Sequence, residues 1–210
     1  MFTARTLLEG KWAIIILLAL TGIGLRWCWP VAVVSAVLLV FTISFFRDPT
    51  AIIPADEKVI VAPATGQIVE IKPVGETIRV AIFLSVFDVH VQRAPIAGTI
   101  RSVEYRPGKF LDVRNPQASA ANESRQIVIV APDGFQVKVR QIAGLIARRI
   151  VGWCGEGATL QKGEHIGMIR FGSRVELYVP RELAGKVCVN IGQATRAGET
   201  VLVAIAKESS

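Results

Sequence analysis

The strongest constraint on the fold is the contrast between the first 46 residues and the rest of the chain. Two apolar stretches, residues 12–25 and 27–46, open the sequence and are separated by Arg26. A helix rises about 1.5 Å per residue, so the second stretch is long enough to cross a hydrocarbon layer of about 30 Å. We therefore predict a membrane anchor of one or two apolar helices over residues 1–46 and a separate domain over residues 47–210.

A secretory signal peptide is the alternative reading of this segment, because Arg5 and Lys11 precede the first apolar stretch. No A-x-A-like cleavage site follows that stretch, and the second one comes at once, so we favour retained insertion. Either two short transmembrane helices form a hairpin that turns near residues 26–30, or one helix spans and the other lies in the interface. Lys11 and Arg47 flank the pair, which predicts that both ends of a hairpin are cytoplasmic. A single span would place the domain on the other side.

Beyond residue 46 the sequence changes to short apolar runs that are separated by proline and glycine. The runs are rich in valine and isoleucine, and several alternate apolar with polar residues, a pattern typical of strands. Turn signals such as Pro132-Asp133-Gly134 lie between them. One run, residues 142–151, predicts a short helix. The nine predicted strands cover residues 59–62, 67–71, 77–83, 99–105, 126–130, 135–141, 165–171, 174–178 and 201–206.

Many short strands with regular punctuation indicate a mainly β sandwich or barrel. With 51% hydrophobic residues, 20% charged residues and a net charge of +7, the chain is neither a disordered segment nor a basic nucleic-acid tail. Residues 62–68 (APATGQI) and 94–100 (APIAGTI) share four positions, and each runs into a predicted strand. This phrase resembles the strand–turn–strand units of barrel-sandwich hybrid domains, such as biotinyl and lipoyl carriers. We therefore expect a barrel-sandwich-hybrid-like β domain.

The pair Gly172-Ser173 is the first candidate for chemistry, since it stands between two predicted strands. Glycine reaches backbone angles that let the hydroxyl of the next residue approach the preceding carbonyl. An isolated Gly-Ser pair is more often only a β-turn, so the surrounding sequence has to decide.

Three long phrases supply that context: residues 87–95 (FDVHVQRAP), 141–150 (QIAGLIARRI) and 167–174 (GMIRFGSR). With them the chain resembles the pyruvoyl-dependent phosphatidylserine decarboxylases, in particular the short bacterial form with an N-terminal membrane segment. The similarity runs from residues 45–49 (FFRDP) to Pro180.

That resemblance implies self-processing without water at the bond between Gly172 and Ser173. The Ser173 Oγ would attack the Gly172 carbonyl, and β-elimination of the resulting ester would separate a β chain, residues 1–172, from an α chain, residues 173–210. The remaining dehydroalanine would lose ammonia and become an N-terminal pyruvoyl group, the covalent cofactor. The amine of phosphatidylserine would form a Schiff base with this group, which accepts electrons as CO₂ leaves. The resemblance implies no metal and no dissolved cofactor.

His90 and Asp88 are the predicted acid–base residues. At positions i and i+2 of a strand-like stretch their side chains face the same side, so the carboxylate is expected to orient or charge the imidazole. They belong to the active-site motif of the family, which implies that His90 carries the proton in self-cleavage, after CO₂ loss, or in both. A surface ion pair on a strand edge is the alternative. His165 is expected to be incidental.

Three further residues are candidates for substrate binding. Arg93 is expected to contact the substrate carboxylate or phosphate. Asn122 and Glu123 match an Asn-Glu pair of the family, which implies that they close or line the site. An Asx-type turn is the alternative for this pair.

The chain departs from the longer family members at two positions. Those members carry an aspartate where this chain has Thr65, and a second histidine where it has Arg93. A threonine hydroxyl is not a general base near neutral pH. Either Asp88 and His90 alone serve the self-cleavage step, or maturation is slow or impaired.

The sequence thus predicts a membrane-anchored phosphatidylserine decarboxylase that forms phosphatidylethanolamine and CO₂. A membrane-tethered carrier or adaptor without enzymatic activity is one alternative, and a family member that acts on another serine-type substrate is a second. The expected location is the bacterial inner membrane, with the catalytic domain facing the cytoplasm. The three cysteines are scattered and form no disulfide framework, which fits a reducing compartment. The expected partners are phosphatidylserine, the membrane and further copies of the α–β pair in a homo-oligomer, with no nucleic acid.

Overall fold

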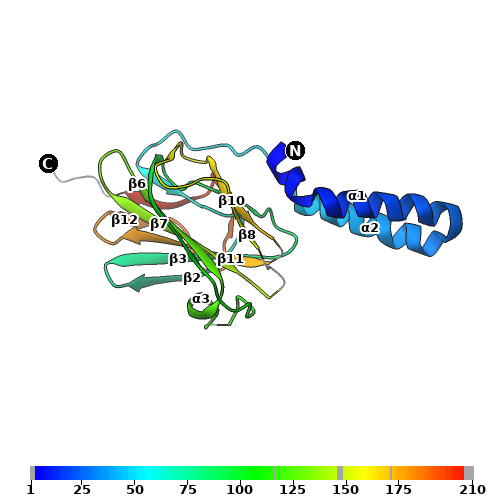
Figure 1. Cartoon of the computed structure of the whole chain (residues 1–210). Helices are drawn as coiled ribbons and strands as arrows, with labels where there is room; N and C mark the ends of the chain where they lie inside the picture. Colours follow the sequence, from blue (N-terminus) through cyan, green and yellow to red (C-terminus); the bar gives the residue numbers. More distant parts are fainter. Residues whose placement is uncertain (1–2, 116, 146–148, 171, 206–210) are drawn as a thin grey trace. The chain divides into compact units, whose positions relative to one another are not determined.

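A computed structural model describes residues 3–115, 117–145, 149–170 and 172–205. The chain forms two compact units, Met1–Thr50 and Ala51–Ser210. The first unit is helical, and the second is built mostly from strands (Figure 1). This confirms the predicted fold class, a mainly β domain preceded by an apolar helical segment.

The first unit is a hairpin of two antiparallel helices, α1 (Ala4–Trp27) and α2 (Trp29–Phe45). Small residues let the two helices approach each other: a Cβ on Gly24 would clash with the backbone of α2, and the Thr21 hydroxyl donates to Ser35 Oγ over 3.0 Å. Most of the other side chains of the pair are apolar and exposed. By length and composition α1 is suited to cross a membrane, and α2, with 17 residues, is shorter.

The second unit is dominated by antiparallel strands. Besides the short helix α3 (Ala118–Ala121), its elements are β1 (Val59–Val61), β2 (Gly66–Val74), β3 (Thr77–Leu84), β4 (Val91–Arg93), β5 (Gly98–Arg106), β6 (Ser124–Val130), β7 (Gln136–Ala143), β8 (Ile150–Gly152), β9 (Thr159–Leu160), β10 (His165–Ile169), β11 (Ser173–Pro180), β12 (Ala184–Val187), β13 (Ala194–Thr195) and β14 (Val201–Ile205).

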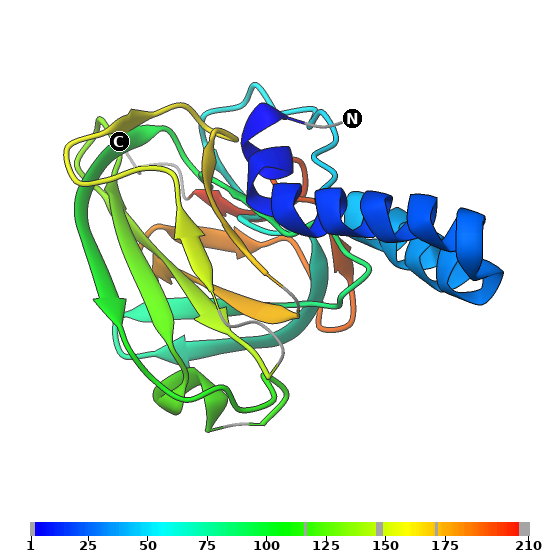
Figure 2. The same cartoon turned by 45° about the vertical axis from the view of Figure 1, so that its right-hand side comes forward.

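The largest sheet has eight strands in the order β13-β2-β3-β11-β7-β6-β5-β9. It curls strongly, as Figure 2 shows, and two three-stranded sheets, β1-β14-β12 and β4-β10-β8, complete the unit. Strand β11 lies in the interior of the large sheet, between β3 and β7. The fold therefore holds β11 from both sides.

Strand β11 is buried on both of its faces. Val175, Leu177 and Val179 point into the apolar core, as the two-residue period of a strand requires. Arg174 and Glu176 point to the opposite face, where their side chains form an ion pair with an N–O distance of 2.9 Å. A strand buried on both faces keeps its first residue in a fixed position.

The two A-P-x-x-G-x-I phrases form a structural repeat. The Val61 N–H donates to the Pro95 oxygen over 3.0 Å, and the Arg93 N–H donates to the Pro63 oxygen over 2.9 Å, so each phrase binds the other in the same way. The strands that follow, β2 and β5, share one burial pattern and a register irregularity at corresponding positions. The sequence echo is therefore a true signal of the fold.

All nine predicted strands coincide with observed strands, although two predicted ends, at residues 171 and 206, lie outside the described residues. Five observed strands were not predicted, because they are two to four residues long and too short for a periodic pattern: β4, β8, β9, β12 and β13. The predicted helix over residues 142–151 is wrong at both ends. Its first two residues are the last two of β7, and its last two residues belong to β8. Residues 146–148 lie outside the described part of the chain. Residues 142–143 pair with β11 and residues 150–151 pair with β10, and this pairing overrides a local sequence pattern that is compatible with either a helix or a strand.

Candidate active site

The Gly172-Ser173 pair lies at the entry of the buried strand β11. Ser173 pairs with Leu84 of β3 on one side and with Ala143 of β7 on the other. The serine is fully buried, and among the described residues its Oγ has no hydrogen-bond partner. Buried polar groups are normally paired. An unpaired hydroxyl at this position therefore marks a candidate nucleophile.

Gly172 has a φ of +66°, in the left-handed region that favours glycine. Its N–H donates to Nε2 of the fully buried His90 over 3.2 Å. The other ring nitrogen, Nδ1, lies 2.9 Å from the backbone oxygen of Asp88. An N–H only donates and a carbonyl only accepts, so these contacts assign a neutral imidazole with the proton on Nδ1. The proton-accepting nitrogen thus faces the residue before Ser173.

Asp88 holds His90 through its backbone and not in the way the sequence predicted. Both residues precede β4, in a turn closed by a 3.0 Å hydrogen bond from the Asp88 N–H to the Ser85 oxygen. The Asp88 carboxylate accepts a hydrogen bond from the Ser85 N–H over 2.8 Å. The assumption of a strand with both side chains on one face is therefore wrong. The carboxylate stabilises the turn that presents the imidazole.

Asn122 is buried next to the strand that holds Ser173. Its Nδ2 donates to the Ala143 oxygen over 2.8 Å and to the Leu111 oxygen over 2.8 Å, and its Oδ1 accepts from the Leu111 N–H over 2.9 Å. Since Ala143 is the β7 partner of Ser173, Asn122 joins a loop to the backbone beside the candidate nucleophile. The structure thus brings this predicted residue to the edge of the site.

The other predicted substrate contacts have partners elsewhere. Desolvation, and then the charge and hydrogen bond of the Glu123 carboxylate, raise the pKa of Tyr105, an exposed residue at the end of β5. The Arg93 guanidinium donates to the Gly163 oxygen over 3.0 Å. A role of Glu123 or Arg93 in substrate binding stays a prediction.

Thr65 and His165 have structural contacts. The Thr65 hydroxyl oxygen accepts a hydrogen bond from the Ala197 N–H over 3.0 Å. The His165 ring stands edge-on to Trp153, with 5.9 Å between ring centroids. Thr65 therefore ties the first half of the unit to its C-terminal segment.

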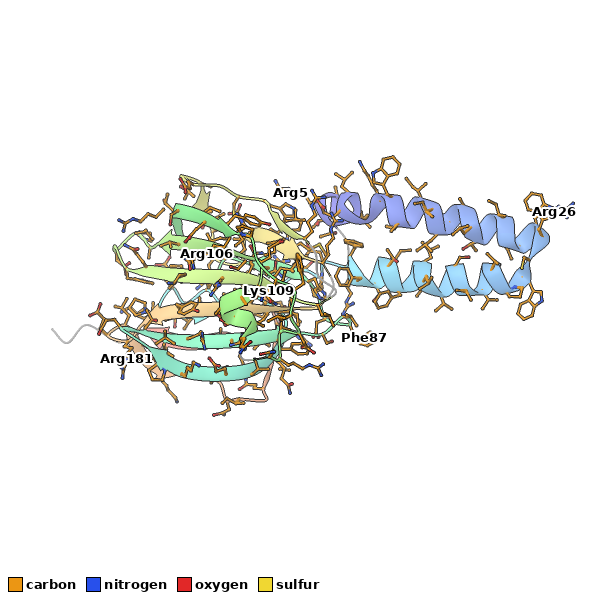
Figure 3. The ribbon with its side chains drawn as sticks, turned by 60° about the horizontal axis from the view of Figure 1, so that its bottom comes forward. Arg5, Arg26, Phe87, Arg106, Lys109 and Arg181 are labelled. Carbon is orange, nitrogen blue, oxygen red and sulfur yellow. The ribbon has the colours of Figure 1, made fainter. Side chains whose placement is uncertain are left out.

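A cavity of about 320 Å³ opens beside the Gly172-Ser173 pair, with Gly172 in its wall. Phe87 and Leu145 line it and are 72% and 62% exposed, unusual values for such large apolar side chains. Figure 3 shows Phe87 at one end of the β-rich unit. The remaining apolar lining comes from Phe83, Leu84, Val86 and Val113.

Among the described residues that line this cavity, Arg114 is the only cation. Arg114 makes an ion pair with Asp112, whose pKa is lowered to about 2, chiefly by the hydrogen bond from the Arg114 side chain. Both side chains are substantially exposed, so the guanidinium remains accessible to an anionic ligand. Sequence reasoning missed this arginine, because nothing in its local pattern separates it from a surface charge.

Sequence reasoning also missed residues that act through the backbone or through buried amides. Gly144 lies so close to the Gly172 carbonyl oxygen that a Cβ would clash with it. Gln92, Gln141 and Arg125 are buried and hydrogen-bonded to one another. The sequence signals that could have indicated them are a glycine and a glutamine, Gly144 and Gln141, within the otherwise mostly apolar first half of the phrase 141–150.

Comparisons with known proteins show which family the sequence is similar to. A sequence model of the family described as phosphatidylserine decarboxylase matches residues 38–203. A phosphatidylserine decarboxylase proenzyme of Oleidesulfovibrio alaskensis is 45% identical over 183 residues, which cover 84% of this chain and 83% of that protein. Proteins of the same name from Trichlorobacter lovleyi and Geobacter sp. strain M21 are 47% identical over 177 residues and 44% identical over 202 residues. These matches cover 82% and 93% of this chain, and 80% and 91% of those proteins.

Proposed function

The chain belongs to the phosphatidylserine decarboxylase family, and we propose that it is a proenzyme that cuts itself at Gly172–Ser173 and then converts phosphatidylserine to phosphatidylethanolamine and CO₂. The resemblance stated from the sequence is confirmed. Family membership makes the chain an enzyme, which removes the carrier or adaptor alternative. The names of the relatives specify phosphatidylserine, which favours this lipid over another serine-type substrate.

One observation supports the proposed cleavage site above all others. The Ser173 hydroxyl is buried without a partner among the described residues, directly after a left-handed glycine whose N–H is held by His90 Nε2. The pair is thus a rigid backbone segment with an available nucleophile and a proton acceptor near by.

Self-cleavage would start with attack of the Ser173 Oγ on the Gly172 carbonyl carbon. A new C–O bond forms, and the Ser173 nitrogen leaves, so that the peptide becomes an ester. We assign to His90 Nε2 the transfer of the hydroxyl proton to that nitrogen. β-Elimination then breaks the Cβ–Oγ bond and leaves a carboxylate on Gly172 and dehydroalanine at position 173. Water replaces the nitrogen at the α-carbon, and ammonia is released.

The residues around Ser173 fit the pyruvoyl group that this reaction would produce. The group would stand at the first residue of β11, where the serine hydroxyl now lacks a partner among the described residues and where the neighbouring Gly172 lines the cavity. When present, it supplies an electron sink for decarboxylation. His90 would then hold the proton that replaces the lost carboxylate.

The two chains should stay together after the cut. Residues 173–210 contain β11 to β14, and β11 is paired with both β3 and β7 of the longer chain. Strands β13 and β14 pair with β2 and β1. Separation would therefore require unfolding of the sheets. We propose that such α–β pairs assemble further into homo-oligomers, which sedimentation of the detergent-solubilised enzyme tests.

The cavity beside Gly172 suits the polar–apolar junction of a phospholipid. Its wall is mostly apolar, and the Arg114 guanidinium offers a bidentate partner for the substrate phosphate or carboxylate. Exposed Phe87 and Leu145 would face the apolar part of the membrane surface. Arg93 stays a second candidate for an anionic contact.

The helical hairpin suits insertion across the inner membrane, with both ends and the catalytic unit in the cytoplasm. Arg5 and Arg26 lie 21 residues apart on α1, about 31 Å of helix, which matches the hydrocarbon thickness, and the 17 residues of α2 rise about 25 Å between Arg26 and Arg47. This spacing supports two spans with Arg26 at the far surface. A membrane-impermeant maleimide added to intact cells should label Cys28 at the hairpin tip and leave Cys188 unmodified, whereas labelling of Cys188 would place the catalytic unit outside.

Denaturing electrophoresis with mass spectrometry tests the proposed function. The purified protein should give two chains, residues 1–172 and residues 173–210, the shorter blocked to Edman degradation. Ser173→Ala should remain one uncut chain, and the control Ser102→Ala, on β5, should be cut normally. Cut material should release CO₂ from phosphatidylserine and not from free serine. A single chain without a carbonyl that reacts with hydrazines would contradict the proposal.

A further inference from the structure

A chain of buried hydrogen bonds runs from Arg125 on β6 to the backbone of His90. Arg125 Nη1 donates to Gln141 Oε1 over 3.0 Å, and Gln141 Nε2 donates to Gln92 Oε1 over 2.8 Å. Gln92 Nε2 donates to the His90 oxygen over 2.7 Å. Gln92 and Gln141 are fully buried, and Arg125 is 6% exposed. These residues are thus shielded from solvent.

The arginine determines which group donates and which accepts in every one of these hydrogen bonds. A guanidinium has donors only, so Gln141 must turn its oxygen to Arg125 and its N–H₂ to Gln92. Gln92 must then turn its own oxygen to Gln141, which leaves its N–H₂ for the His90 oxygen. Arg125 itself is held by the backbone oxygens of Cys154, at 2.6 Å, and Ile166, at 3.3 Å.

Two glycines leave the space that this chain occupies. A Cβ on Gly152 would lie 2.6 Å from the guanidinium carbon of Arg125. A Cβ on Gly167 would lie 3.0 Å from Gln141 Nε2. The strands β8 and β10 are therefore shaped around the arginine and the amide.

We propose that Arg125 is a positioning residue for self-cleavage, which acts through Gln141 and Gln92 to hold the His90 backbone in place. The inference rests on the proposed role of His90. It follows because the imidazole meets Gly172 through a single 3.2 Å hydrogen bond, and a shift of the backbone that carries it displaces Nε2. Misplacement of a reacting group by about 1 Å can slow a reaction by about a hundredfold.

Gln141→Glu tests the donor and acceptor order of these hydrogen bonds, because glutamate and glutamine side chains have nearly the same volume. The new carboxylate still accepts from Arg125, with which it forms an ion pair, but it has no N–H for Gln92. Gln92 then gives its N–H₂ to the carboxylate and turns its oxygen toward the His90 oxygen, so that two acceptors face each other. We expect self-cleavage of the full-length precursor to slow by about tenfold or more, while the new ion pair with Arg125 offsets the opposed oxygens and the precursor stays folded.

The measurement is a time course of conversion of the 210-residue precursor, made by cell-free synthesis into phospholipid nanodiscs. Gln136→Glu, at the other end of β7, is the matched control and should cleave at the wild-type rate. Cleavage of Gln141→Glu at the wild-type rate would overturn the inference, as would slow cleavage accompanied by a matching loss of thermal stability. Because the wild type is measured alongside, failure of the proposed function would be seen separately, as a precursor that does not cleave at 172–173.

A second substitution restores the missing donor. Lysine in place of Gln92 has only donors, so in Gln92→Lys/Gln141→Glu the ammonium group serves both the carboxylate and the His90 oxygen. The double variant should therefore cleave faster than Gln141→Glu. A double variant that keeps the wild-type unfolding midpoint and is as slow as Gln141→Glu would also count against the inference.

Discussion

Gly144→Ala should block self-cleavage while it leaves the fold in place. A Cβ on Gly144 would lie 3.3 Å from the Gly172 carbonyl carbon and closer than 3.0 Å to its oxygen, a separation that real Cβ atoms do not show. The oxygen belongs to the carbonyl that the Ser173 Oγ would attack in the proposed self-cleavage. The added methyl group would therefore act directly on the peptide bond that we propose is cut.

The size of the effect follows from the geometry. The clash is with backbone, which cannot rotate away, so the Gly172 carbonyl must retreat by several tenths of an ångström to about 1 Å, a displacement that can cost about a hundredfold in rate. Gly144 has no positive φ, so alanine adds no backbone strain. Crowding of this kind typically costs about 1–3 kcal/mol of stability, which leaves a folded protein.

The assay is the time course of conversion of the full-length precursor into its two chains, followed by mass spectrometry. Gly155→Ala is the control, because a Cβ there would meet nothing within 4 Å. The variant should accumulate as a folded precursor with the unfolding behaviour of a compact domain. Conversion of Gly144→Ala at the rate of the control would refute the reasoning.

Three further predictions concern the loop, the cavity rim and the buried ions. Asn122→Ala removes the two hydrogen bonds that its Nδ2 donates, so it should slow self-cleavage and also lower the free energy of unfolding by about 1–3 kcal/mol, as measured by denaturant titration. Phe87→Ser should raise the KM for phosphatidylserine in vesicles and leave kcat for a short-chain, monomeric substrate unchanged, whereas Ile191→Ser, a control at another exposed apolar residue, should alter neither. Burial alone would raise the pKa of Glu70, but the hydrogen bond and charge of Arg79, with the charges of Arg174 and Lys72, together outweigh it and lower the pKa below 4.5. The carboxylate thus adds stability above pH 4.5 that is lost as the pH falls through its lower folded value, so Glu70→Gln should unfold with a weaker acid dependence than the wild type.

The sequence predicted the parts of the molecule that depend on long patterns. The long strands follow their valine and isoleucine content, and the repeated A-P-x-x-G-x-I phrase reports a repeat of hydrogen bonding that the structure contains. The candidate pair Gly172-Ser173 was predicted from a long phrase and not from local propensity. In the structure it lies at the entry of an interior strand that is fully buried as far as Val179.

The details of the site depend on tertiary contacts that no local pattern contains. Asp88 and His90 alternate as strand residues do, but the chain turns at Ser85 and presents the imidazole through a backbone oxygen. Arg125 and Gln141 look like ordinary polar positions of alternating strands. They are buried because the small sheet β4-β10-β8 packs against them, and only the pairing of distant strands determines this contact.

The burial of Ser173 also gives a physical reason for cleavage by the serine itself. Hydrolysis would leave an α-amino group at position 173, with an ordinary pKa of about 7.7–8.0 and hence largely charged near neutral pH. That charge would stand at a residue with no exposed surface, between β3 and β7, where burial of an unpaired ion is strongly unfavourable. Self-cleavage that ends in a keto group removes this nitrogen as ammonia. The new chain end is then neutral, and the interior strand can keep its place while its first residue becomes the reactive group.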